Sequence, residues 1–151
     1  MEVIEHPKLL VVGLPVMANW HELWQKMPRA WQTLFARQEE IPHRRGCLDC
    51  SLDKREEQYL QLVGCQVSRL RPVPPQMQAV EIPAQRYLHH THLGPTSAIA
   101  ETFGLMYEWA SVHGLQVGEF KLDRGYRADG RETEHDLYIG LNPVKPWREV
   151  R

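Results

Sequence analysis

The sequence lacks the features that identify several large classes of protein. Its apolar run Leu9–Val12 near the N-terminus is too short for a signal peptide or a membrane span. A large net charge is also absent, because 18 Lys and Arg residues nearly balance 19 Asp and Glu residues. That balance argues against a nucleic-acid binder held by a positive field. We therefore expect a cytoplasmic protein with no membrane segment and no direct contact with nucleic acid.

The chain is also poor in cysteine and in motifs for nucleophilic or phosphate chemistry. Cys47, Cys50 and Cys65 are an odd number of thiols without a secretory signal, so we expect them to be reduced. The single Cys-x-x-Cys pair has no second pair to complete a metal site, and we expect structural thiols there. Neither a Gly-x-Ser-x-Gly turn nor a glycine-rich phosphate loop occurs. These absences give no support to a serine hydrolase or a nucleotide-binding enzyme.

Three histidines, His89, His90 and His92, occur within four positions and raise the question of a metal site. In a strand, alternate side chains share a face, so His90 and His92 point one way while His89 and Thr91 point the other. A zinc site needs three or four ligands, and no acid or cysteine lies at a spacing that compels a third. We therefore expect no metal and no cofactor.

What is present is the composition of one globular domain. The 151 residues are enough to bury a core, and 42% of them are hydrophobic. The proline-rich connector "RPVPPQ" (71–76) cannot lie inside a sheet and marks the middle of the chain. We expect a single domain over residues 1–151, with a first half at about 8–70 and a second half at about 77–145.

The two halves repeat the same order of predicted elements. Each has a strand that ends in Gly and Pro, then an amphipathic helix, then two further strands. The first helix is predicted to begin after Asn19 and to kink or restart near Pro28, and the second begins at Pro95. This βαββ repeat predicts an α+β fold in which two helices lie on one sheet with a cleft between the halves.

Large aromatic side chains recur on both predicted helices. Trp20 and Trp24 lie along one face of the first helix, and Phe103 and Tyr107 lie on the second. The simplest interpretation is that most of these rings belong to the core. Two facing helices with large rings also form a flat apolar pocket that suits an aromatic or cationic ligand.

The stretch "GEFKLD" (118–123) supplies charge for such a pocket. Alternation along a strand puts Glu119, Lys121 and Asp123 on one face, with Phe120 and Leu122 on the other. The charged face is either solvated or contains a buried carboxylate that anchors a cation.

Five stretches together resemble the GyrI-like family, also known as the AraC-type effector-binding domain. They are "QYLQLVGCQV" (58–67), the proline-rich connector, "VEIPAQRYLHHTHLGP" (80–95), "LMYEWASVHG" (105–114) and "DLYIGLNPV" (136–144). The resemblance runs from about Leu9 to Val144. It implies a duplicated βαββ module, with two helices packed on one curved antiparallel sheet and a small-molecule pocket between the halves. Because the chain begins directly at the first strand, we expect a stand-alone member without a DNA-binding domain.

The resemblance also implies site residues. The family commonly has a Phe-Glu-x-Tyr stretch whose Glu, at the base of the pocket, attracts lipophilic cations. Here Lys121 stands at the acid position and Asp123 at the tyrosine position. A register shift of two residues puts Glu119 at the acid position instead. The other residues implied by the resemblance are Trp24, Tyr59 and Tyr138.

We therefore predict a ligand-binding site of eight residues: Trp20, Trp24, Tyr59, Phe103, Tyr107, Glu119, Lys121 and Tyr138. The expected function is binding of an aromatic or amphipathic small molecule, a drug or effector of neutral or cationic character, for sensing or sequestration. Multidrug binding and transcription regulation in a bacterium are the implied settings. Two alternatives stay open: a protein-interaction module like the gyrase-inhibiting relatives, and a hydrolase acting on a reactive ligand in the same pocket. We assign no catalytic residue.

Overall fold

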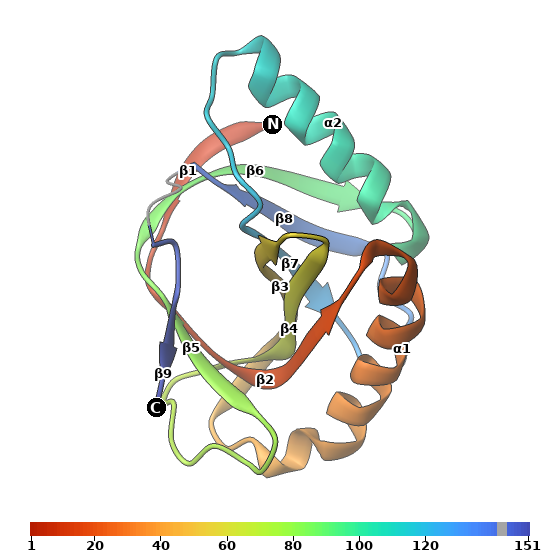
Figure 1. Ribbon diagram of the computed structural model, residues 1–151, viewed down its shortest axis with the longest axis vertical. Coiled ribbons are helices and arrows are strands. Elements are labelled where there is room, and N and C mark those ends of the chain that lie inside the picture. Colours follow the sequence, from red (N-terminus) through yellow and green to blue (C-terminus); the bar gives the residue numbers. More distant parts are fainter. Residues whose placement is uncertain (142–144) are drawn as a thin grey trace.

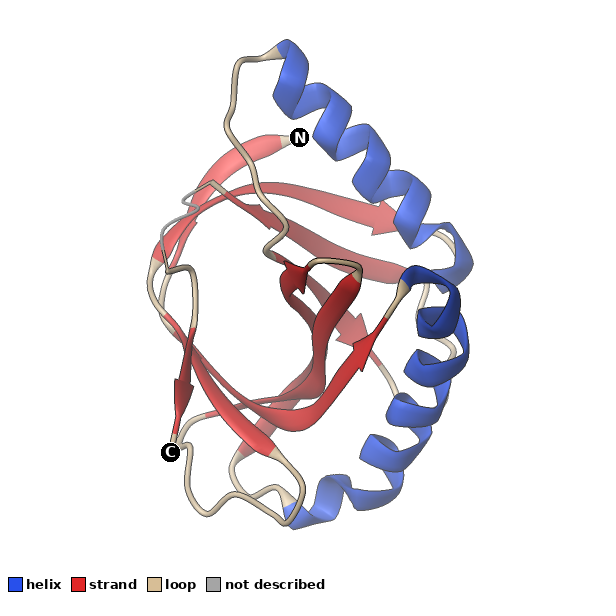
Figure 2. Ribbon diagram, viewed as in Figure 1, coloured by secondary structure: helices blue, strands red, loops and turns tan. Residues whose placement is uncertain are grey.

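The computed structural model describes residues 1–141 and 145–151, so residues 142–144 of the terminal "DLYIGLNPV" stretch lie outside the described residues. Within the described part, the chain forms one nine-stranded antiparallel sheet and two α-helices (Figures 1 and 2). The strands are β1 (Glu2–His6), β2 (Leu9–Ala18), β3 (Arg44–Arg55), β4 (Gln58–Val67), β5 (Gln78–Ile82), β6 (Gln85–Leu93), β7 (Lys121–Tyr126), β8 (Glu134–Gly140) and β9 (Arg148–Val150). The helices are α1 (Trp20–Arg37) and α2 (Ile99–Val112).

The strand order confirms the predicted repeat. It runs β1-β6-β8-β7-β3-β4-β2-β5-β9, so β2-α1-β3-β4 and β6-α2-β7-β8 are mirrored about the β3–β7 pair. Both halves thus contribute three adjacent strands to one sheet, as the α+β prediction requires. The sequence pattern missed the short strands β1 and β9, which pair with β6 and β5 at the two edges of the sheet.

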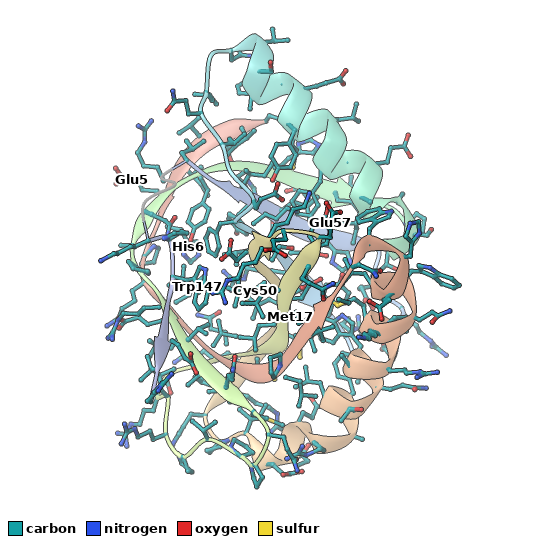
Figure 3. All side chains as sticks on the ribbon, viewed as in Figure 1. Glu5, His6, Met17, Cys50, Glu57 and Trp147 are labelled. Carbon is teal, nitrogen blue, oxygen red and sulfur yellow. The ribbon has the colours of Figure 1, made fainter. Side chains whose placement is uncertain are left out.

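The sheet curls strongly, and both helices lie on its outer face (Figure 2). Side chains of the inner face, including Cys50, form a buried apolar cluster against which Trp147 packs (Figure 3). On the outer face, α1 covers a second cluster around Leu34, Ile41 and Val63, and α2 covers a third around Met106. Each half therefore has its own helix-covered core on a shared sheet. None of the described helices is long and apolar enough to cross a membrane.

Local sequence explains how the helices begin. Asn19 caps α1, because its side chain accepts a hydrogen bond from the Glu22 amide while the Glu22 carboxylate accepts one from the Asn19 amide. Pro28 lies inside α1, yet the helix continues without a restart, so that part of the expectation at residues 25–28 was wrong. Pro95 does not occupy the first turn of α2, because a short 3-10 turn, Thr96–Ala98, separates them.

Two facing glycines set the close approach of β2 and β4. Gly13 and Gly64 are partners in the ladder, and a Cβ at Gly64 would lie 2.5 Å from the carbonyl oxygen of Val12. A Cβ at Gly13 would lie 2.2 Å from the carbonyl oxygen of Val63. Only residues without a Cβ fit this contact between two backbones.

Replacing Gly64 with alanine is therefore expected to destabilise the fold by about 1–3 kcal/mol, as overpacking does in a tight core. The measurement is the midpoint of urea denaturation. Gly46→Ala in β3 is the matched control, because no heavy atom lies within 4 Å of the Cβ it would add. Equal midpoints for the two variants would contradict the close-approach argument.

Candidate functional site

A cleft of about 440 Å³ opens between the first turn of α1 and the sheet-facing side of α2. Its floor is the outer face of the paired strands β3 and β7, at the seam between the two halves. The lining residues are Trp20, Asp49, Ser51, Thr96, Ile99, Ala100, Phe103, Gly104, Tyr107, Lys121, Leu122, Asp123 and Tyr126. A cleft between the halves is thus where the repeat predicted one.

Aromatic rings from both halves form the walls. Trp20, at the start of α1, is 63% exposed and stands at the rim. Phe103 and Tyr107 come from α2, and the Tyr107 hydroxyl donates a 2.8 Å hydrogen bond to the Gly118 carbonyl. Tyr126 stacks on Trp31 with 4.2 Å between ring centroids. Rings fixed in this way offer rigid apolar area to a ligand.

Charged side chains of the floor are brought together by the register of β3 and β7. Asp49 lies opposite Asp123, and Ser51 lies opposite Lys121. Because alternate residues share a face, all four side chains point toward the helices. The cleft floor therefore carries two carboxyl groups and one amine under an aromatic wall.

Asp123 is buried, and its two oxygens are hydrogen-bonded. Its Oδ2 accepts from the Tyr126 hydroxyl at 2.6 Å, and its Oδ1 lies 2.9 Å from Nδ1 of His135. That hydrogen bond raises the pKa of the His135 imidazole, which favours the protonated form beside the carboxylate. Asp123 therefore has its partners within the protein.

Asp49 has no such support. Its Oδ1 is buried without a hydrogen-bond partner among the described residues. Burial, together with the nearby charge of Asp123, raises the pKa of the Asp49 carboxyl to about 8, against the smaller opposing effect of Lys121. Near neutral pH the Asp49 carboxyl is therefore largely protonated until something in the cleft favours its ionised form.

Lys121 shows the opposite shift for the same reason. Its Nζ lies 5.8 Å from the ring centroids of both Phe103 and Tyr107, and 3.4 Å from the Glu119 carbonyl oxygen. Burial lowers the pKa of the Lys121 ammonium, although Glu119 and Asp49 act against that effect. The cleft thus drives both a carboxyl and an amine toward their neutral forms.

Four of the eight residues predicted for the site line this cleft: Trp20, Phe103, Tyr107 and Lys121. Tyr59 is on the same side of the sheet, with its ring 6.0 Å from that of Trp20, but it does not line the cleft. Trp24 is 70% exposed on α1, one turn beyond Trp20. Glu119 is exposed and precedes β7, so the strand alternation that placed it beside Lys121 does not reach it.

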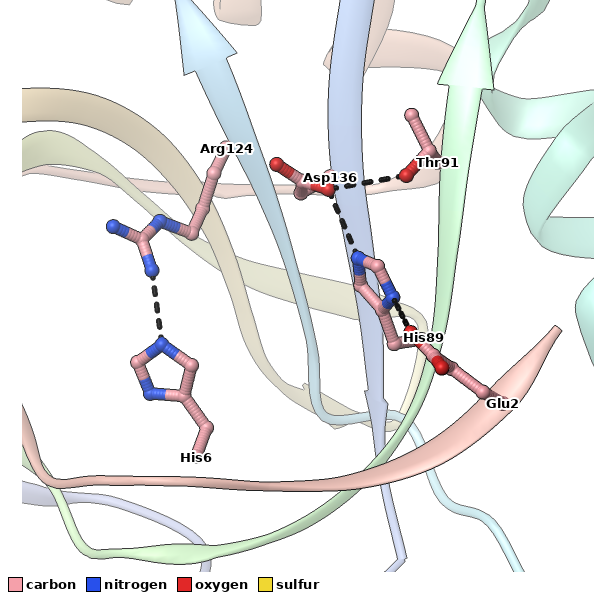
Figure 4. A network of polar contacts seen from close by, with 6 residues as sticks. All are labelled: Glu2, His6, His89, Thr91, Arg124 and Asp136. Atoms are coloured by element: carbon pink, nitrogen blue, oxygen red, sulfur yellow. Dashed lines mark hydrogen bonds and ion pairs between the residues drawn. The ribbon is translucent and has the colours of Figure 1, made fainter.

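Tyr138 lies on the inner face of the sheet, away from the cleft. It packs with Tyr87 at 5.5 Å between ring centroids. The neighbouring polar network is on the same face: His89 lies between Glu2 and Asp136, at 3.1 and 2.9 Å (Figure 4). The resemblance identified the strand that contains Tyr138 but not the face to which its side chain points. The side chain points to the inner face, whereas the cleft is on the outer face.

The histidine cluster is divided between the two faces, as alternation predicted. His89 and Thr91 both bind Asp136 on the inner face, whereas His92 contacts Thr102 of α2 at 2.7 Å. Among residues 1–141 and 145–151, no three His, Cys, Asp or Glu side chains are grouped to hold a metal ion. The cysteines are free thiols, and the sulfur atoms of Cys47 and Cys65 lie 3.8 Å apart across β3 and β4.

The predicted site of eight residues left out five polar residues of the cleft, of which only Asp123 had been placed on the charged strand face: Asp49, Ser51, Thr96, Asp123 and Tyr126. Asp49 lies inside the Cys-x-x-Cys stretch "CLDC" (47–50), whose most conspicuous feature in the sequence is its pair of thiols. Its placement follows from the β3–β7 register, a pairing between strands about seventy residues apart that no local pattern contains. Asp49 and Ser51 alternate with apolar residues along the strand, and this pattern in the sequence indicates that their two side chains point to the same face.

The fold and the cleft together define a GyrI-like protein, with two helices against a curled antiparallel sheet and a pocket at the seam of the repeat. The chain belongs to the Cass2 family of integron-associated effector binding proteins, whose family model matches residues 2–141. No curated protein matches the chain by sequence.

Several solved structures share the fold at low sequence identity. SAV2435 bound to tetraphenylphosphonium has a TM-score of 0.72 and 9% identity, over 95% of this chain and 94% of that one. The integron cassette protein VCH_CASS2 of Vibrio cholerae has a TM-score of 0.65 and 8% identity, over 93% and 95%. EcmrR in its complex with DNA has a TM-score of 0.65 and 15% identity, over 99% of this chain and 57% of the longer one.

Replacing Asp49 with asparagine is expected to stabilise the protein increasingly as pH rises. Unfolding returns the Asp49 carboxyl from a pKa of about 8 to its ordinary 3.8, so between those values the unfolded chain binds fewer protons and stability falls as pH rises. Asparagine cannot ionise and removes this loss. The gain should be small near pH 4 and grow to several kcal/mol above pH 8, because each unit of difference between the folded and unfolded pKa corresponds to about 1.4 kcal/mol.

Thermal unfolding at a series of pH values measures this effect. Asp53→Asn is the matched control, because Asp53 is on the same strand, has a side chain 42% exposed and pairs with Arg55. A gain for Asp49→Asn that does not grow with pH would contradict the assignment of a buried, proton-binding carboxyl.

Proposed function

We propose that this cleft binds an aromatic, lipophilic small molecule, with preference for a cation, and that the protein acts by sensing or sequestering it in the cytoplasm. The observation that carries the proposal is the unpartnered, buried oxygen of Asp49 beneath rings from both halves. A lipophilic cation supplies both of the contacts that this arrangement lacks, which are apolar area against the rings and a positive charge beside the carboxylate.

The ligand of one protein with the same fold and the description of the family both support this proposal. Tetraphenylphosphonium, the ligand of SAV2435, is a delocalised cation enclosed by phenyl groups. The family to which this chain belongs is described as effector binding. In this chain the acid that would face such a cation is Asp49 on β3, while Lys121 occupies the neighbouring strand. We infer that the cation preference depends on which of these two groups is ionised.

The charge preference can be tested with two ligands of the same shape, tetraphenylphosphonium and tetraphenylborate. We expect the phosphonium to bind more tightly, and its affinity to rise by up to about tenfold per pH unit below pH 8 because Asp49 must lose its proton. Isothermal titration calorimetry between about pH 6 and pH 9 measures this. Asp49→Asn should remove most of the pH dependence.

Weak binding of both ions at every pH would contradict the proposed function. Tighter binding of the borate would contradict the cation preference, and would indicate that Lys121 rather than Asp49 sets the charge of the cleft. Quenching of tryptophan fluorescence gives a second readout, because Trp20 stands at the rim. Trp20→Phe is the control for that signal.

Replacing Lys121 with methionine is expected to strengthen phosphonium binding about three- to tenfold near pH 6. The ammonium repels a cation about 4 Å away by about 1 kcal/mol at the dielectric of water, which is roughly a fivefold change in affinity, and methionine keeps similar length and apolar volume. Lys54→Met is the matched control, because Lys54 also lies over an aromatic ring, 5.1 Å from the Tyr59 centroid, but is exposed and outside the cleft. Equal affinities of the two variants would contradict a like-charge role for Lys121.

A further inference from the structure

Lys121 is an amine in surroundings that are unusual for lysine. Its Nζ faces the rings of Phe103 and Tyr107 at 5.8 Å, and its one hydrogen-bond partner in the described part of the chain is the Glu119 carbonyl at a long 3.4 Å. Within the described residues, no carboxylate oxygen lies within 4.0 Å of Nζ. By contrast, Lys8 and Lys26 pair with Glu81 and Glu22. Lys121 therefore lacks the ion pair that would keep its proton in place.

We propose that Lys121 forms a Schiff base with aromatic aldehydes that enter the cleft, which makes the protein a covalent, reversible trap for reactive carbonyl compounds. The inference rests on the proposed function, because the same aromatic walls must first hold the ligand. An amine that is desolvated in an apolar pocket is the form of lysine that attacks carbonyl carbon. Burial lowers the pKa of Lys121 and so increases the fraction of neutral amine.

The reaction requires no reagent other than the amine and the aldehyde. The lone pair of Nζ forms a bond to the carbonyl carbon, and one proton of the amine passes to the carbonyl oxygen to give a carbinolamine. The C–O bond then breaks, and the hydroxyl leaves as water with the second amine proton, which leaves a C=N bond. No atom is oxidised or reduced, and hydrolysis reverses the reaction.

Asp49 is positioned to assist the second step. Ser51 lies opposite Lys121 and Asp49 lies opposite Asp123, so Asp49 and Lys121 are diagonal neighbours on one face of the floor. The Asp49 carboxyl has an Oδ1 without a partner among the described residues and is protonated below about pH 8. A neutral carboxylic acid there can donate its proton to the departing hydroxyl and take back the second amine proton from Nζ as the C=N bond forms, so that water is the only product released.

The test is reductive trapping with cinnamaldehyde and sodium cyanoborohydride at neutral pH, followed by peptide mass spectrometry. We expect the adduct to form severalfold faster at Lys121 than at Lys54, since the lowered pKa of Lys121 leaves a larger fraction of free amine and the aromatic walls hold the aldehyde beside it. Lys54 is the internal control, because its hydrogen bond to Tyr59 raises its pKa. Lys121→Met should abolish the fast adduct while leaving that at Lys54 unchanged.

Cinnamyl alcohol separates this inference from the proposed function, because it has the same skeleton and no carbonyl group. If the alcohol binds in the cleft but Lys121 traps the aldehyde no faster than Lys54, the Schiff base is overturned and ligand binding stands. If neither compound binds while tetraphenylphosphonium does, the Schiff base is overturned and the proposed function stands, and if none of the three binds, both proposals are overturned. Asp49→Asn, which removes the proton donor and keeps the shape, should slow adduct formation at Lys121 relative to adduct formation at Lys54.

Discussion

The pairing of β3 with β7 is the contact on which the rest of the molecule depends. It joins the two βαββ halves into one sheet, and it is the centre about which the strand order is mirrored. Without it, each half would present an exposed, unpaired strand edge, and as a smaller unit it would bury a smaller fraction of its surface. With it, α1 and α2 are held on the same outer face, with the seam between them as the floor of a cleft.

The same pairing determines which side chains meet at that floor. Because strand residues alternate between faces, a register that puts Asp49 opposite Asp123 also puts Ser51 opposite Lys121 on the outer face. A shift of one residue would replace these with Cys50 and Leu122, which belong to the inner apolar cluster. The register of β3 and β7 therefore determines which chemical groups line the cleft. The polar floor lies between the two helix-covered cores, one under α1 and the other under α2.

This dependence explains what the sequence did and did not predict. The periodicity of Trp20–Arg37 and of Ile99–Val112, and the Gly and Pro residues between elements, are local signals, and they were sufficient for the repeat and its fold class. The aromatic residues of the cleft walls on the helices could also be predicted, because the spacing of residues along a helix shows which of them share a face. Asp49 and Tyr126 were missed, and Glu119 and Tyr138 were placed in the pocket, because strand register and strand ends are set by long-range pairing.

Burial under the aromatic wall then acts on the two central charges in opposite directions. It raises the pKa of Asp49 and lowers the pKa of Lys121, so burial favours the neutral form of each group. Asp123 differs because Tyr126 and His135 already hydrogen-bond its two oxygens. A bound ligand of either charge therefore shifts the ionisation of Asp49 or of Lys121, so the charge of these two groups depends on what the cleft holds. Selectivity then comes from the rings and the shape of the seam, with charge as an adjustable contribution rather than the primary filter.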